Sequence, residues 1–128
     1  MPQREIEVIL MRQLASYLTL PIFIVDPEGR LLFYNEPAEA ILGRRFEETG
    51  EMSGDEWAQI FTASDGDGTP LPPEELPLMI ALRERHPAHR RFVIRGLDAV
   101  HREIEVTAFP LVGHAGRHLG AVALFWEL

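Results

Sequence analysis

The stretch IFIVDPEGRLLFYN, residues 22–35, decides the fold of this chain. It consists of two apolar runs, rich in β-branched and aromatic residues, joined by Asp-Pro-Glu-Gly. This tetrapeptide suits a type I turn, because Pro27 presets φ, Asp26 bonds the turn backbone and Gly29 takes the left-handed position. Two such runs around a turn predict a β-hairpin.

A short helix is predicted directly after the hairpin. Asn35 is of a residue type that caps helix N-termini, residues 36–42 suit a helix, and Gly43 can end it. A sheet that opens with a hairpin and then crosses through short helices has a concave side. Such a side can hold a small molecule or transmit a change in shape.

The N-terminal segment predicts an amphipathic helix over residues 5–18. Its apolar residues recur at helical spacing, in a stripe wide enough to cover both the sheet of its own chain and a partner. The helix is expected to end near Leu20, because a residue that precedes proline disfavours the helical conformation.

The remaining elements follow from periodicity and from Gly and Pro positions. They are a short helix turn at 56–61, a loop at 64–70, a helix at 74–85 with Pro77 near its start, strands at 90–95, 101–110 and 120–127, and a hairpin loop at 112–118. Together with the first hairpin, these strands predict a five-stranded α+β domain with the helices packed on one face.

The last of these strands is apolar on both faces. Alternation directs one set of side chains to each side of the sheet: Ala121, Ala123 and Phe125 on one, and Val122, Leu124 and Trp126 on the other. A strand that is apolar on both faces has to be covered on both. The short helices are expected on one side and the N-terminal helix, from this chain or a second copy, on the other.

Composition excludes several functions. The 128 residues suffice for one domain with a sizeable core, and the net charge of −8 argues against binding nucleic acid. The chain has no Lys, which rules out a Schiff-base cofactor, and no Cys, which rules out disulfides, thiolate metal sites and thioether adducts. No apolar run approaches a membrane span and the N-terminus does not read as a signal peptide, so a cytoplasmic location is expected.

The order and spacing of these motifs resemble a PAS domain. The likeness rests on the turn at 26–30, the Asn35 cap with the helix that follows, the segment 67–82 and the strand 106–111. It implies the PAS (profilin-like) fold over residues 20–128. The apolar stripe of the N-terminal segment predicts that residues 1–19 form a dimerisation helix on the outer face of the sheet. The resemblance also implies a bacterial sensor or interaction module, usually dimeric, that acts on a kinase, cyclase or transcription regulator. The chain is expected to be either a stand-alone PAS protein or a piece of a longer sensor.

Two sets of candidate site residues follow. The expected pocket lies between sheet and helices, where the alternative is a filled core without a ligand; its residues are Phe23, Val25, Leu82, Phe92, Ile94, Ile104, Val106, Ala108, Ala123 and Phe125. The expected dimer interface lies on the outer face, where the alternative is a helix folded only onto its own sheet; its residues are Ile6, Ile9, Leu10, Leu14, Tyr17, Phe109, Val122, Leu124 and Trp126. A small apolar ligand suits the pocket, but the sequence names none.

Other chemistry has little support in the sequence. Photosensory relatives of this fold attach their chromophore through Cys, which is absent. His86 is the nearest candidate for a haem ligand, but it lies among arginines that indicate an exposed position. Asp65 and Asp67 resemble the start of a calcium loop, yet Leu76 stands where that loop needs Glu. No catalytic motif is present, so we expect a protein that is not an enzyme. The functional alternatives are an interaction module without a ligand and a haem sensor.

Overall fold

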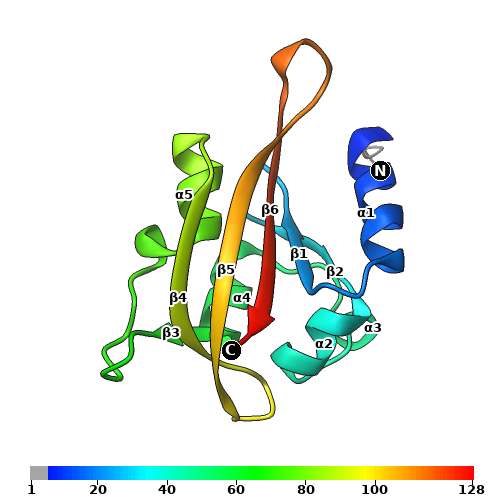
Figure 1. Ribbon diagram of the computed structural model, residues 1–128. Coiled ribbons are helices and arrows are strands. Elements are labelled where there is room, and N and C mark those ends of the chain that lie inside the picture. The colour runs from blue at the N-terminus through cyan, green and yellow to red at the C-terminus, as the bar shows by residue number, and fades with distance from the viewer. Residues whose placement is uncertain (1–5) are drawn as a thin grey trace.

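The structure, a computed structural model, describes residues 6–128, except for the side chains of residues 58–60. Its elements are α1 (Ile6–Tyr17), β1 (Ile22–Val25), β2 (Leu31–Tyr34), α2 (Glu36–Leu42), α3 (Phe46–Thr49), α4 (Gly54–Ile60), β3 (Thr62–Ser64), the 3-10 turn η1 (Pro73–Glu75), α5 (Pro77–Glu84), β4 (Ala88–Arg95), β5 (His101–Val112), the 3-10 turn η2 (His114–Gly116) and β6 (His118–Glu127) (Figure 1). The predicted helix 5–18 corresponds to α1, with Glu5 outside the described residues.

The strands form one antiparallel sheet in the order β2-β1-β6-β5-β4-β3. The prediction of five strands is therefore wrong by one. The strand that was missed is β3, in which Thr62 pairs with Arg95 and Ser64 with Val93 of β4. Its three residues, Thr-Ala-Ser, carry no apolar alternation, and they form a strand because an edge of β4 is available to pair with.

The predicted helix 74–85 is divided at Pro77 into η1 and α5. Proline has no N–H to donate and disfavours helical conformation in the residue before it. Pro77 therefore begins α5 rather than continuing an earlier helix.

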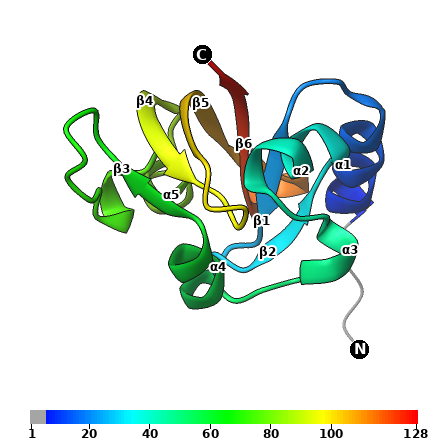
Figure 2. The ribbon, with the colours of Figure 1, turned by 90° about the horizontal axis from the view of Figure 1, so that it is seen from below.

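The sheet separates two apolar layers. α5 lies on one side of it and α1 on the other (Figure 1), and Figure 2 shows the same arrangement from below. The inner cluster contains Ala121, Ala123 and Phe125 of β6, whereas the outer cluster contains Val122 together with Val8 of α1. Since β6 lies between β1 and β5 and is covered on both sides, the prediction for the last strand is confirmed.

The first hairpin forms as predicted. Gly29 has φ +84°, and the Asp26 carboxylate accepts hydrogen bonds from the backbone N–H groups of Glu28 (3.0 Å) and Arg30 (2.9 Å). Gly43 ends α2 in the left-handed conformation, at φ 83°. Local turn and cap chemistry therefore fixes where this part of the chain changes direction.

The Asn35 side chain joins three elements. Its Oδ1 accepts from the N–H of Ile22 (3.0 Å), at the start of β1, and from the N–H of Ala38 (3.2 Å), in the first turn of α2. Its Nδ2 donates to the carbonyls of Ala15 and Leu20, both at 2.9 Å, at the end of α1 and in the connection that follows. With 1% of its surface exposed, this amide exchanges its water contacts for four hydrogen bonds.

Replacement of Asn35 should destabilise the domain strongly. Asn35→Ala removes the partner of two buried N–H groups and of the Leu20 carbonyl, and leaves the Ala15 carbonyl with only its 3.3 Å bond from the Leu18 N–H. We therefore expect a loss of about 3 kcal/mol in the free energy of unfolding. Urea denaturation measures this. Asn35→Asp is the matched control, because it retains the acceptor oxygen that caps α2 but loses the donor to Ala15. A cost below about 1 kcal/mol for the alanine variant would contradict this role.

Candidate functional site

A cavity of about 70 Å³ lies between the inner face of the sheet and helices α4 and α5. The strands contribute its floor, and α2, α4, α5 and the segments beside them contribute the remaining walls. The lining residues are Phe23, Leu42, Trp57, Phe61, Ala63, Leu76, Pro77, Leu78, Phe92, Ile94, Ile104, Val106, Ala123 and Phe125.

Seven of the ten predicted pocket residues line this cavity: Phe23, Phe92, Ile94, Ile104, Val106, Ala123 and Phe125. The other three, Val25, Leu82 and Ala108, lie in the same buried cluster without lining the cavity. Strand alternation identified the floor, because it shows which side chains face inward. The helical and loop walls were missed, because their side chains meet the cavity only through tertiary packing.

The side chains of the described residues that line the cavity are apolar, apart from the indole N–H of Trp57. The indole N–H of Trp57 already donates to the carbonyl of Gly29 at 2.8 Å, so it is not available to a ligand. An empty apolar cavity of about 150 Å³ in another protein takes up benzene or xenon. The present cavity is about half that size, so it fits one small uncharged apolar group, and a molecule as large as benzene exceeds it.

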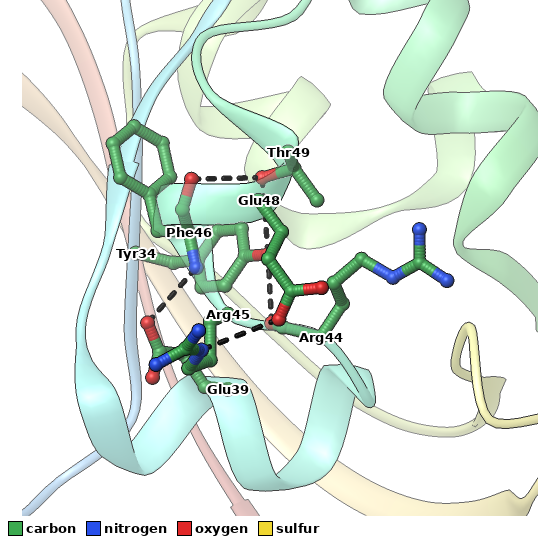
Figure 3. A network of polar contacts seen from close by, with 7 residues as sticks. All are labelled: Tyr34, Glu39, Arg44, Arg45, Phe46, Glu48 and Thr49. Atoms are coloured by element: carbon green, nitrogen blue, oxygen red, sulfur yellow. Dashed lines mark hydrogen bonds and ion pairs between the residues drawn. The ribbon is translucent and has the colours of Figure 1, made fainter.

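Tyr34 lies beside this cavity and joins it to α3. Its ring is fully buried and stacks on the Phe23 ring, with 6.0 Å between centroids and an interplanar angle of 3°. The hydroxyl donates to the Arg44 carbonyl (2.9 Å) and lies 3.2 Å from Thr49 Oγ1 (Figure 3). Burial raises the pKa of the phenol, an effect that the Thr49 contact partly offsets.

The short segment that contains α3 is held in place by further polar contacts. Figure 3 shows the Phe46 N–H donating to Glu39 Oε2 (2.9 Å) and the Thr49 hydroxyl bonded to the Phe46 carbonyl (3.4 Å). The Arg45 and Glu48 side chains form an exposed ion pair at 3.2 Å, which contributes little to stability. Because the Arg44 carbonyl at one end of this segment bonds the Tyr34 hydroxyl and Thr49 at the other end contacts it, the position of the segment depends on that ring.

The predicted interface residues divide into two groups. Those on α1 project into solvent, with exposed fractions of 67% for Ile6, 47% for Ile9, 55% for Leu10, 53% for Leu14 and 85% for Tyr17. Those on the sheet are more covered: Val122 is buried, Phe109 and Leu124 pack against the outer cluster, and Trp126 is half-buried. The helix instead faces its own sheet through Val8, Met11 and Ala15.

Two contacts besides Asn35 hold α1 to the domain. Glu7 Oε2 accepts from the backbone N–H of His114 (3.0 Å) in the β5–β6 hairpin, and that hydrogen bond lowers the pKa of Glu7. The Arg12 guanidinium lies over the Phe33 ring, 4.7 Å from its centroid. A groove of about 160 Å³ remains between α1 and β2, so packing there is incomplete.

The candidate metal and haem residues lie apart from the cavity. His86 is exposed and bonds the Pro87 carbonyl and Glu84, contacts that raise its pKa. The Asp65 carboxylate accepts from the N–H groups of Asp67 and Thr69, as a turn residue does. Within residues 6–128 no cluster of His, Asp and Glu has the arrangement of a metal site.

No described helix is long and apolar enough to cross a membrane.

An antiparallel sheet with short helices around an internal cavity and a helix on its outer face defines the PAS architecture. The sequence model of the PAS fold family matches residues 17–128, and the chain belongs to this family. No curated protein matches the chain by sequence.

Solved structures of PAS domains superpose along nearly the whole chain. A PAS domain from Colwellia psychrerythraea is 15% identical, with a TM-score of 0.67 and coverage of 95% of this chain and 97% of that one. The PAS domain of nitrogen regulation protein NR(II) from Vibrio parahaemolyticus is 16% identical, with a TM-score of 0.65 and coverage of 93% and 98%. A Rhodobacter sphaeroides LOV protein is 13% identical, with a TM-score of 0.73 and coverage of 97% and 68%. At these identities the likeness shows the fold.

The raised pKa of Tyr34 predicts a loss of stability at alkaline pH. Above the ordinary tyrosine pKa of 10.0 the unfolded chain loses the phenol proton while the folded chain keeps it. The free energy of unfolding should therefore fall as pH rises beyond that value. Tyr34→Phe should abolish this alkaline decrease in the free energy of unfolding. Tyr17→Phe, at an exposed site, should retain it. Urea midpoints from pH 8 to 11 test this, and identical profiles for all three proteins would refute it.

Proposed function

We propose that this protein is a PAS sensor and interaction module of bacterial signal transduction that binds a small apolar ligand in its inner cavity. The observation that carries the proposal is a cavity in the inner layer that the described residues line with apolar side chains. Interiors normally pack without such voids, so an unfilled apolar space favours a ligand over a purely structural core. The structural likeness to the PAS domain of a nitrogen regulation protein supports the signalling role.

Ligand occupancy would act by favouring one position of α1 over another. A ligand shifts such an equilibrium only by its difference in affinity for the two arrangements. The cavity provides that difference, because it is too small for most molecules unless its walls move. The output would be a kinase or transcription-regulator domain or protein, and the site carries no catalytic role because its walls contain no ionisable group.

We also propose that α1 forms a homodimer interface with the outer sheet face. Five large apolar side chains of α1 are exposed on one short helix, and Trp126 of β6 is half-buried. Exposed apolar surface of this extent typically marks an interaction site. A dimer through α1 would place the element that responds to the ligand at the contact between two copies.

A second candidate function is interaction without a ligand, and the small cavity volume favours it. Haem is not proposed, because no histidine lines the cavity. The ligand-binding sensor and the interaction module without a ligand differ in whether the cavity binds a small molecule.

Xenon should enter the cavity. We expect the methyl resonances of Ile94, Ile104 and Val106 to shift with xenon pressure in NMR spectra, because these residues line the space. Ala123→Val adds two methyl groups to the lining and should abolish the shifts. Ala88→Val is the matched control, since it makes the same change on β4 outside the cavity. Absence of shifts in the parent protein would contradict ligand binding and favour the module without a ligand.

The exposed face of α1 should control association. Leu10→Glu combined with Leu14→Glu places charge in the proposed interface and should yield a monomer at concentrations where the parent dimerises. Thr62→Glu combined with Thr69→Glu adds the same charge at exposed polar positions in and after β3, at the opposite edge of the sheet from β2, and should leave the dimer intact. Sedimentation velocity measures both. A parent that stays monomeric at every concentration, or a leucine variant that dimerises normally, would contradict the interface.

A further inference from the structure

A continuous set of ring contacts leads from the cavity to α1. Phe23, which lines the cavity, stacks on Tyr34 at 6.0 Å. Tyr34 meets the Phe46 ring edge-on at 5.3 Å, and Phe46 meets Phe33 at 5.2 Å in the same way. Arg12 of α1 lies over the last two rings, 4.7 Å from the Phe33 centroid and 5.5 Å from that of Phe46. We call Phe23, Tyr34, Phe46 and Phe33 the ring path.

The ring path passes around the sheet rather than through it. β2 is an edge strand, and its neighbouring residues Phe33 and Tyr34 face opposite sides. Tyr34 belongs to the inner cluster and Phe33 packs against the outer one. Phe46 of α3 touches both rings and therefore joins the two layers beyond the edge of the sheet.

Ring packing and polar contacts hold Phe46, in the middle of the ring path, against Tyr34. The Tyr34 hydroxyl bonds the Arg44 carbonyl and contacts Thr49, so it holds the segment on either side of Phe46 (Figure 3). The Phe46 N–H bond to Glu39 fixes the same segment to α2. A displacement of the Tyr34 ring therefore displaces Phe46 as well, because the two are joined by ring packing and by hydrogen bonds.

The far end of the ring path has room to move. The groove between α1 and β2 has a volume of about 160 Å³ and is lined by Val8, Ile9, Arg12, Ile24, Leu32, Phe33 and Glu51. Within the described residues, the partners of the Arg12 guanidinium are the two rings rather than a carboxylate. A cation held on ring faces follows those faces when they tilt. The helix can thus shift into the groove while Asn35 holds its C-terminal end.

We propose that the ring path transmits occupancy of the cavity to α1, with Phe46 as the connecting side chain around the sheet edge. This inference rests on the proposed function, since it requires that the cavity binds a guest. A guest larger than the cavity pushes on Phe23, the stacked Tyr34 ring moves with it, and Phe46 carries the movement to Phe33 and Arg12. A guest that fits without displacing the walls leaves α1 where it is.

The experiment compares hydrogen exchange of the α1 amides with benzene and with xenon bound. Benzene exceeds the cavity, so in the parent protein it should change the α1 exchange rates at least about fivefold, the lower end of usual coupling between sites. Xenon should leave these rates unchanged, because it fits the cavity without displacing the walls. In Phe46→Leu, benzene should no longer change the exchange rates of the α1 amides. NMR titration of benzene should give similar affinities for both proteins, because Phe46 does not line the cavity.

Two further variants distinguish the ring path from general loosening. Phe109→Leu makes the same change at a half-buried phenylalanine of the outer face and should retain the benzene effect. Arg12→Met keeps the side-chain stem but loses the cation, and should lose the effect. A Phe46→Leu protein that binds benzene and still responds at α1 would overturn the ring path while leaving the proposed ligand site intact. Failure of benzene and xenon to bind the parent would overturn both.

Discussion

The fold depends most on the four hydrogen bonds of the buried Asn35 amide. This side chain begins β1, caps α2 and holds the last turn of α1, so three elements take their relative positions from it. A buried amide that satisfies both donors and both acceptors is stable in one arrangement only, because any slip leaves polar groups unpaired. The end of α1 is therefore fixed, while its beginning is held by the exposed contact of Glu7 with the hairpin.

This asymmetry gives the two apolar layers different roles. The inner layer encloses the cavity, and the outer layer is completed by a helix that leaves a groove beside it and apolar side chains in solvent. A helix held firmly at one end and only by an exposed hydrogen bond at the other can change position at low cost. The account therefore assigns sensing to the inner layer and output to α1, with the edge of β2 as the place where the layers meet.

Sequence reasoning succeeded where the determinants are local. The turn at Gly29, the Asn35 cap, the end of α2 at Gly43 and the two-sided cover of β6 all follow from residue types at fixed spacing. It missed β3, whose three residues form a strand only because β4 offers an edge. It also missed Phe46, because no periodicity indicates that a residue of a four-residue helix will touch rings on both sides of a sheet. The predicted stripe on α1 consisted mostly of residues that are exposed; of those that contact the domain it included Val8 and Met11 but not Ala15.

The most direct test of the central claim is a crystal structure of the full chain soaked in benzene, compared with the same crystal under xenon. The account predicts density in the cavity in both, with the Tyr34 and Phe46 rings and the N-terminal half of α1 displaced only with benzene bound. Benzene density in the cavity with α1 and Phe46 unmoved would contradict it.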